Sequence, residues 1–394
     1  SHLQLILANL LRAHNDGKEA VSFSRNRNDY TPPFRRVKWK ECSERYSPFG
    51  ATHDPLINAI DNMTKLGLVE GRKGYRDEIF PGAYVGSWSR IWATEKLLGV
   101  IEKQFNIDVD SIGFSLDKET VMLRDQNKNP MDYEDTETTI QMRQDLKALN
   151  MLLQETTLTL SRYEDEQEEE HNAKLNRPYH KFMYRVFNNG SFERGGRFSG
   201  GHWISGLPKY LRERIRINGQ ETVLWDFETM SMNLLYNYAD LQCRPGASPG
   251  WWRGSMEPRE WPDLQKIHKN LMNFALNTDS IEEWIRVCRG YYSPKIRPKQ
   301  GPIDDRMLQE FLFKFHAPIK DLLFTKDLGL RLMYTESRIT DGIIRAFVDR
   351  SIPILPINDG FICPSEHEDL LKDTMLSRYT KVTGKVVSGI HKEH

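Results

Sequence analysis

The chain has 394 residues, enough for two domains or for one large domain with lobes. Hydrophobic residues make up 39% and charged residues 28%, a balance that excludes a disordered or membrane-spanning class. Because 55 basic side chains balance 55 acidic ones, the net charge predicts no nucleic-acid partner, and such binding would depend on where the charge lies.

The expected compartment follows from the cysteines and the N-terminal segment. Cys42, Cys243, Cys288 and Cys363 include no Cys-x-x-Cys pair, which argues against a zinc knuckle and a disulfide framework. Residues 1–15 are too short and too polar at their flanks for a signal peptide. We therefore expect a cytoplasmic protein with no membrane partner.

The first predicted helix begins near residue 54. Apolar residues recur at helical spacing from Leu56 to Leu66, and Gly67 ends the pattern. A strand, a basic turn, a returning strand and another helix are expected over residues 68–105. This order resembles a winged-helix module, a type often used on duplex DNA. A small α+β support domain is the alternative.

A second long helix is predicted over residues 136–153, followed by an acidic block. Six of the seven residues at 164–170 are acidic. Like charges repel each other and stay solvated, so we expect a linker or exposed loop at 164–175. It would divide an N-terminal winged-helix-like and helical domain, residues 1–163, from a core at 176–394.

The core alternates strand and helix patterns, which predicts an α+β fold. A strand is expected at 222–227, helices at 231–241, 262–277, 307–324 and 337–350, and two strands around a turn at 352–363.

A locally basic segment opens the core. Residues 185–219 contain seven basic and two acidic side chains, a net charge of +5, with aromatic residues between them. Cations that neutralise phosphates, combined with aromatic faces, favour a surface that follows a nucleic-acid backbone. A solvated basic face is the alternative.

Two aspartates carry the predicted chemistry. Asp226 ends an apolar strand, and Asp359 lies between two apolar runs in Asn358-Asp359-Gly360. On neighbouring strands, the two carboxylates would hold two Mg²⁺ or Mn²⁺ ions for phosphoryl transfer. Taken separately, Asp226 is also a suitable helix N-cap, and Asn358 to Gly360 is ordinary turn chemistry.

The helix predicted near 263–277 presents a polar stripe. Its members are Lys266, Lys269, Asn270, Asn273 and Asn277. Such a row of donors would suit a triphosphate, with lysine as a point charge. An ordinary amphipathic surface helix is the alternative.

The order of these segments resembles the palm and fingers of the family-A polymerase superfamily, and most of all the single-subunit RNA polymerases of bacteriophages and mitochondria. Residues 193–197 resemble the Asp-x-x-Gly-Arg element, with Glu193 in place of Asp. Asp226 resembles motif A, residues 268–277 resemble the motif B helix, and residues 358–361 resemble motif C. The likeness covers about residues 180–380.

The resemblance implies a right-hand palm and fingers core, with the helix at 136–153 as a reduced thumb. It implies Asp226, Asp359 and Lys269 as catalytic residues, with both aspartates as metal ligands. It implies nucleotide binding by Lys266, Lys269, Asn273 and Ser231, and DNA-template binding by Arg194, Arg197, Arg212 and Arg214.

Sugar choice depends on Ser231. Family-A DNA polymerases place a Glu five residues after the motif A Asp, where it blocks a ribose, and Ser231 is small. The chain is therefore expected to be a DNA-directed RNA polymerase or a primase that uses nucleoside triphosphates. It departs from the family at His268, Leu276 and Asn358, where Lys, Tyr and His are usual, so a changed substrate preference or slow chemistry is implied.

Two other functions compete with this one. Residues 226–229, Asp-Phe-Glu-Thr, also resemble the first motif of DnaQ-like 3′–5′ exonucleases. A winged-helix DNA-binding replication factor with a degenerate palm is the non-enzymatic alternative. Glu336 is expected to start a helix, with a third acid beside the metals as the alternative. His316 is expected to be structural.

Overall fold

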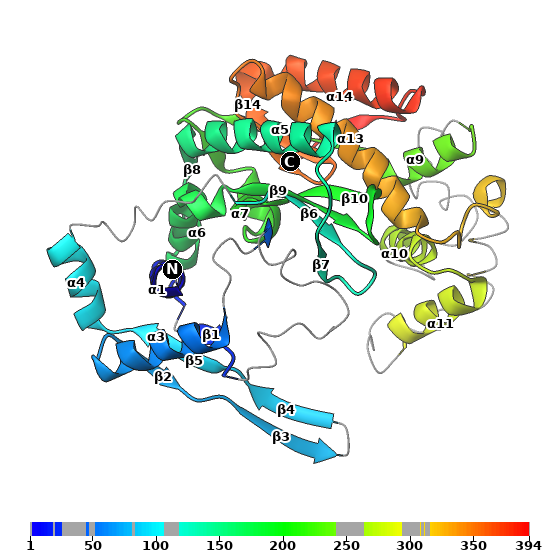
Figure 1. Ribbon diagram of the computed structural model, residues 1–394. Helices are drawn as coiled ribbons and strands as arrows, with labels where there is room; N and C mark the ends of the chain where they lie inside the picture. The colour runs from blue at the N-terminus through cyan, green and yellow to red at the C-terminus, as the bar shows by residue number, and fades with distance from the viewer. Residues whose placement is uncertain are drawn as a thin grey trace.

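The computed structural model describes residues 2–18, 20–25, 45–46, 52–80, 83–105, 118–241, 264–293, 308, 311 and 316–393. These residues form a mixed α+β fold, as predicted from the sequence (Figure 1). Buried apolar side chains gather in two clusters. The smaller cluster draws on residues between Ile6 and Ile101, and the larger one on residues between Val121 and Val387.

The smaller cluster is built from helices around a three-stranded sheet. The helices are α1 (His2–Asn15), α3 (His53–Lys65) and α4 (Glu95–Phe105). The sheet has the order β1 (Val21–Phe23), β5 (Ser89–Ala93), β2 (Val69–Arg72), with antiparallel pairing throughout. A hairpin of β3 (Tyr75–Phe80) and β4 (Ala83–Ser87) extends away from this sheet (Figure 1).

Local chemistry explains where α3 ends. Gly67 adopts the left-handed φ of 67°. Its N–H donates to the carbonyl of Thr64, and the N–H of Leu68 donates to the carbonyl of Met63. This pair of hydrogen bonds is a Schellman motif, which favours glycine because the left-handed conformation has no Cβ penalty there. The helix ending at Gly67 is confirmed, while the winged-helix assignment stays a prediction.

The larger cluster contains three sheets. The first has the order β10 (Ser191–Gly200), β9 (Met183–Asn188), β6 (Val121–Arg124), β7 (Pro130–Met131). The second pairs β11 (Ile215–Ile217) with β8 (Leu158–Leu160). The third has the order β13 (Leu355–Ile357), β14 (Gly360–Pro364), β12 (Thr222–Phe227), β15 (Ile390–Lys392).

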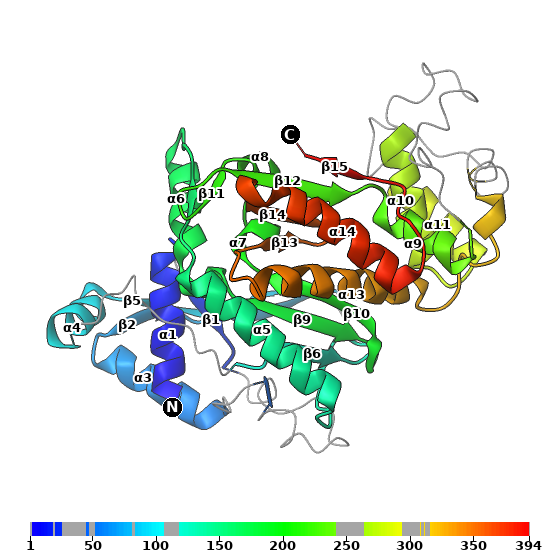
Figure 2. The ribbon, with the colours of Figure 1, turned by 90° about the horizontal axis from the view of Figure 1, so that it is seen from above.

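Helices surround these sheets. They are α5 (Glu137–Glu155), α6 (Glu166–Asn176), α7 (His202–Ser205), α8 (Lys209–Arg212), α9 (Met230–Tyr238), α10 (Leu264–Leu276), α11 (Ile281–Tyr291), α13 (Leu328–Val348) and α14 (Glu368–Thr383). Viewed from above, α13 lies between α14 and α5 (Figure 2). Within the described ranges, no helix combines the length and the apolar character needed to cross a bilayer.

The linker or loop predicted at 164–175 is wrong, because this segment forms α6. Asp165 caps the helix by accepting a hydrogen bond from the N–H of Glu168, and acidic residues fill the first turn. Negative side chains are favourable there because they face the positive end of the helix dipole. Leu175 is fully buried in the larger cluster. The acidic block is therefore the start of a packed helix.

Helix α5 also packs into the larger cluster. Leu146, Leu149 and Leu153, the residues expected in register, are all buried in the larger cluster. The two clusters thus separate between Ile101 and Val121, whereas the sequence placed the domain boundary at the acidic block. The expected helix at 307–324 is also only partly right, since the described residues 316–324 form a short 3₁₀ helix, Ala317–Ile319, and turns.

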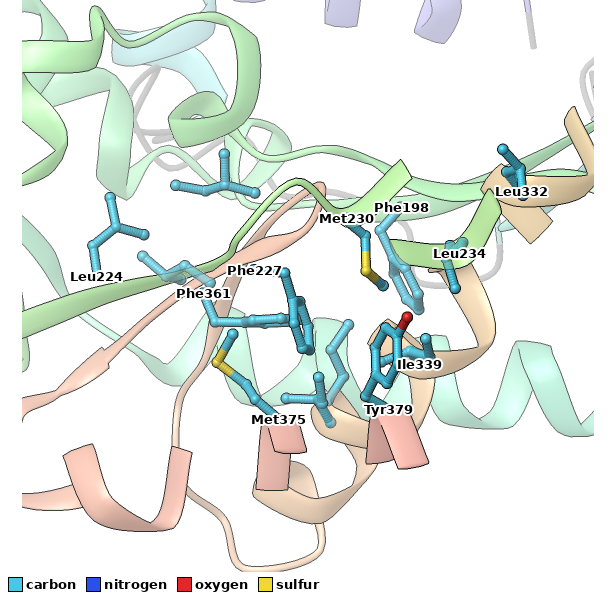
Figure 3. Packing of buried hydrophobic residues seen from close by; sticks show 14 of the residues in the cluster. Phe198, Leu224, Phe227, Met230, Leu234, Leu332, Ile339, Phe361, Met375 and Tyr379 are labelled. Atoms are coloured by element: carbon cyan, nitrogen blue, oxygen red, sulfur yellow. The ribbon is translucent and has the colours of Figure 1, made fainter. Parts of the chain in front are cut away.

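The third sheet and its helices share the core that supports the candidate site. Phe227 and Phe361, from β12 and β14, point toward Met375 and Tyr379 of α14 (Figure 3). Ile339 of α13 is fully buried in the same region. Burial of such large apolar side chains fixes the sheet against α13 and α14, because each contributes about 1.5–3 kcal/mol.

Candidate active site

Asp226 lies on a strand in the middle of its sheet. β12 pairs with β14 on one side and β15 on the other, so Asp226 stands opposite Gly360 and His391. A Cβ built at Gly360 would lie 3.3 Å from Oδ1 of Asp226. Glycine at this position therefore leaves room for the carboxylate, which a larger residue would crowd.

Asp359 lies in the two-residue turn between β13 and β14. Asn358, the first turn residue, has a left-handed φ of 55°, which asparagine tolerates better than most residues. The Thr340 hydroxyl donates to the carbonyl of Asn358 at 3.3 Å, and the N–H of Phe227 donates to the carbonyl of Asp359 at 3.4 Å. The structure thereby brings Asp359 to the end of the strand that carries Asp226.

The two carboxylates share a poorly solvated environment. Burial raises the pKa of Asp226 to about 7, and the nearby charges of Asp359 and Glu393 act in the same direction. Burial also raises the pKa of Asp359, while Arg197 and Lys269 oppose that change. Carboxylates held together in this way disfavour each other's ionised form.

One atom of this group has no partner. Oδ1 of Asp226 is buried and accepts no hydrogen bond within the part of the chain that the structure describes. A buried carboxylate oxygen is costly unless it is paired or bound to a cation. The carboxylates therefore fit a divalent cation with oxygen ligands, such as Mg²⁺ or Mn²⁺.

Sequence reasoning missed two neighbours of Asp226. Ligand atoms of Asp226, His391 and Glu393 all lie within 4.8 Å of one another. The N–H of Glu393 donates to the carbonyl of Leu224 at 3.0 Å and so continues the pairing of β15 with β12. The alternation His391-Lys392-Glu393 places the outer two residues on one face of a strand. That signal is present in the sequence, but it does not say which strand lies beside it.

Glu336 is a further acid near Asp359. It is 2% exposed and lies in the interior of α13, so the expectation that it starts a helix is wrong. Arg197 binds it through two contacts, Nε to Oε1 at 2.6 Å and Nη2 to Oε2 at 2.7 Å. Burial raises the pKa of Glu336, Arg197 lowers it, and Asp359 raises it. This acid is therefore neutralised by Arg197.

Two glycines in β10 aim Arg197 at α13. Gly195 and Gly196 have φ of 79° and 80°, and the pairing of β10 with β9 shifts register on both sides of Gly195. A Cβ on Gly196 would lie 2.5 Å from Phe187 and 2.9 Å from the Ser337 hydroxyl. Such irregularities redirect side chains, and here only glycine fits the space.

The other arginines predicted to bind nucleic acid also have internal contacts. Arg194 pairs with Asp327 at 2.8 Å, and Arg214 pairs with Glu168 at 3.0 Å. Arg212 donates to the carbonyl of Ile204 at 2.8 Å. Their role toward a template stays a prediction.

Helix α10 contributes the residues predicted to bind a nucleotide. Lys269 and Asn273 are exposed, and the positive charge of Lys269 lowers the pKa of Asp359. The side chain of Lys266 lies outside the described residues. His268, which stands at the usual lysine position, is buried with its Nε2 2.7 Å from Nε2 of His316. Of these two adjacent residues, Lys269 is therefore the one whose side chain faces solvent.

Ser231 is the second residue of α9, directly after the strand that carries Asp226. It is partly exposed. Thr229, between the strand and the helix, has a left-handed φ of 45°, which makes the turn into α9 sharp. Ser231 thus lies close to Asp226 along the chain, as predicted from motif A.

Glu228 does not join the acidic group. A Cβ on Gly389 would lie 2.9 Å from the Glu228 carboxyl carbon, which places this side chain against the backbone before β15. Within the described ranges, the group of potential metal ligands around Asp226 contains His391 and Glu393 and leaves Glu228 out. An Asp-x-Glu nuclease motif would use both of its acids on metal, so this arrangement does not favour the exonuclease.

No protein-family model and no curated protein matches the chain. Among solved structures, it is similar to the POL domain of Pol1 from M. smegmatis, described in complex with DNA primer-template and dNTP. That likeness has a TM-score of 0.27 and 10% sequence identity, and it covers 53% of this chain and 47% of the other. The chain thus matches about half of that protein, too weakly for any function to be transferred from it.

Proposed function

We propose that this chain catalyses template-directed nucleotidyl transfer, as a DNA-directed RNA polymerase or primase. The observation that carries the proposal is the buried, unpartnered Oδ1 of Asp226 beside the carboxylates of Asp359 and Glu393. Two further acids beside one unsatisfied oxygen, near the end of a central strand, are better explained by bound cations than by structural stability.

Asp226 and Asp359 would hold the divalent ions, two Mg²⁺ or Mn²⁺, with His391 of β15 and Glu393 directly after it as further donors. When bound, such ions stabilise the charge on the attacking and leaving oxygens. The protein's own contribution is a fixed arrangement of ligands. β12 is held on both sides by β14 and β15, and the Asn358 turn is tied to α13 through Thr340.

The incoming nucleoside triphosphate would lie along α10. Lys269 is exposed and electrostatically coupled to Asp359, so its charge can reach a phosphate that approaches the aspartates. Asn273, one helical turn further, is exposed on the same helix and would donate a hydrogen bond. Lys266 belongs to the same predicted stripe. Ser231 would leave space for a ribose hydroxyl.

The DNA template would contact the segment around β10. The Arg194 side chain is 36% exposed, and its partner Asp327 is exchangeable because surface ion pairs contribute little, about 0–1 kcal/mol. Arg197 is placed differently, since it is bound to Glu336. We assign it the role of holding positive charge beside Asp359, with Arg212 and Arg214 supporting the adjacent α8 and β11.

The test is incorporation of labelled nucleotides on single-stranded and primed DNA with Mg²⁺ or Mn²⁺. Asp226→Asn and Asp359→Asn should each lower incorporation at least ~100-fold, because each removes a metal ligand without changing the side-chain volume. Asp373→Asn, at an exposed position on α14, is the matched control and should retain full activity. Parallel reactions with NTPs and dNTPs identify the sugar.

Three results would count against the proposal. Incorporation that survives both aspartate substitutions would remove its chemical basis. Shortened DNA in place of extended product would identify a nuclease. DNA binding without any synthesis, unchanged in both variants, would identify a binding protein.

A further inference from the structure

A hollow of about 590 Å³ lies between α5, α13 and α14, the three helices that lie side by side in Figure 2. Its volume falls in the range of small-ligand sites, about 300–1,000 Å³. None of Asp226, Asp359, Glu336 and Lys269 lines it. The hollow is therefore distinct from the candidate active site.

The charged lining is mainly basic. It includes five cationic side chains, Arg185, Arg338, Arg345, Arg378 and Lys381, and two acidic ones, Glu137 and Asp341. Such an excess of positive charge in a chain with no net charge is a local feature. It raises the local concentration of anions.

Two of the five cations are neutralised internally. Arg185 is fully buried and contacts Asp341 at 3.2 Å. Arg345 contacts Asp341 at 2.9 Å and also pairs with Asp145 behind it. These four charges balance each other, and three of them, Arg185, Asp341 and Arg345, line the wall of the hollow.

The remaining three cations lack such partners. Arg338, Arg378 and Lys381 form no ion pair and no hydrogen bond with any residue in the described ranges. Arg338 only lies near the ring of Tyr334, with 5.9 Å between its guanidinium carbon and the ring centroid. Glu137 is exposed and, unlike Asp341, forms no ion pair with a residue in the described ranges.

A glycine brings the basic groups of the two helices together. A Cβ on Gly342 of α13 would lie 3.0 Å from Cδ of Arg378 of α14. The absence of that atom lets Arg378 lie across α13, toward the helix face that also carries Arg338 and Arg345. Glycine is otherwise unfavourable inside a helix, so this close approach gives it a structural reason.

We propose that this hollow binds a phosphate-bearing anion, either a free oligophosphate or the terminal phosphate of a nucleic-acid strand. Two arginines and a lysine without internal partners supply the donors that phosphate groups use, and arginine binds them in a bidentate manner. The wall of balanced pairs holds its position because Arg185 also donates to the carbonyl of Gly196 and to the Ser337 hydroxyl.

The first experiment is calorimetric titration of the full chain with inorganic tripolyphosphate in low salt and excess EDTA. The double variant Arg338→Gln/Arg378→Gln should weaken binding by about tenfold or more, because two charge-assisted hydrogen-bond donors are lost. Lys147→Gln, on the exposed side of α5, is the matched control and should bind as the parent does.

Binding of two oligonucleotides that differ only in a 5′-phosphate distinguishes a strand end from a free oligophosphate as the ligand. Preference for the phosphorylated one, lost in the double variant, assigns a strand end. Equal binding of both, with tripolyphosphate still sensitive to the double variant, assigns a free oligophosphate.

A second measurement uses the unaltered protein. Tripolyphosphate should protect Arg338 and Arg378 from an arginine-selective reagent, detected by peptide mass spectrometry, and should leave Arg286 on α11 unprotected. Arg286 is a suitable reference because its side chain is 78% exposed. The proposal is overturned if tripolyphosphate does not bind, if the double variant binds as tightly as the parent, or if protection is absent. It does not depend on polymerase activity.

Discussion

Two arginines on neighbouring strands each bind a carboxylate of α13, and their surroundings differ. Arg197 of β10 binds Glu336 through two short contacts, beside Asp359. Arg185 of β9 binds Asp341 through one contact of 3.2 Å, and Asp341 has Arg345 as a second partner. The two pairs lie on different sides of one helix, toward the candidate active site and toward the basic hollow.

The comparison shows how this helix separates two kinds of charge. Near the aspartates, Glu336 depends on one arginine, and the surrounding acids still exceed the cations, which favours a bound metal. Beside the hollow, Asp341 is already neutralised, and among the described residues the three unpaired cations outnumber the one unpaired acid, Glu137, which favours a bound anion. The following variants test that difference, beginning with the largest expected effect.

Arg197→Met should lower the free energy of unfolding by about 3–5 kcal/mol, because it leaves a buried carboxylate at Glu336 without its partner. Only 3% of the Glu336 side chain is exposed. Urea unfolding followed by circular dichroism measures the loss. The double variant Arg197→Met/Glu336→Leu should recover most of it, and a double variant less stable than the single one would contradict this interpretation.

The same single variant should be sensitive to pH. Burial already raises the pKa of Glu336 above its ordinary value of 4.5, and removal of Arg197 raises it further. A carboxyl group with a raised folded pKa contributes stability below its unfolded pKa, and this contribution is lost as the pH rises through the folded pKa. The deficit relative to the parent should therefore be larger at pH 8 than at pH 5. Equal deficits at both values would argue that packing alone causes the loss.

Arg185→Met should cost less than Arg197→Met, about 1–3 kcal/mol, since Asp341 keeps Arg345 as a partner. The expected loss comes mainly from the Gly196 carbonyl and the Ser337 hydroxyl, which lose a donor. Urea unfolding under the same conditions gives the comparison directly. If Arg185→Met proved the more damaging change, the second partner of Asp341 would have no compensating effect.

The smallest expected effect concerns metal affinity. Arg197 lowers the pKa of Asp359, so its removal makes the site more negative and should tighten Mn²⁺ binding by about three- to tenfold. Arg185→Met should change the Mn²⁺ affinity by less than about twofold, because Arg185 contacts neither Asp226 nor Asp359. Calorimetric titration with Mn²⁺ would detect the difference. Equal shifts in both variants would show that the two sides of α13 are not separated electrostatically.

Much of the secondary structure could be predicted from local pattern. The strand at Thr222–Phe227 and the strands around Asn358 and Asp359 have the predicted bounds to within about three residues. The helix at Glu137–Glu155 is confirmed in the same way. The prediction of a linker at the acidic block was wrong because it considered only the repulsion between like charges. The helix dipole and the cap at Asp165 make the same charges favourable at the start of a helix.

The candidate site was only partly accessible from the sequence. Asp226 and Asp359 stand next to hydrophobic strands, a pattern visible in the chain, and the structure brings them together. His391 belongs to a three-residue strand, too short for periodicity to assign, and Glu393 directly follows it. Its position beside β12 depends on pairing between two segments that are more than 160 residues apart in the chain.

What the sequence determined by itself was local: alternating and helical apolar spacing, Gly67 at the end of a helix, and aspartates at strand ends. These features act over a few residues, through backbone conformation and side-chain periodicity. The tertiary structure alone decided that Arg197 neutralises Glu336, that Glu393 approaches Asp226, and that three unpaired cations surround one hollow. Those facts depend on long-range packing and on burial, which sets both the cost of a charge and the partners available to it.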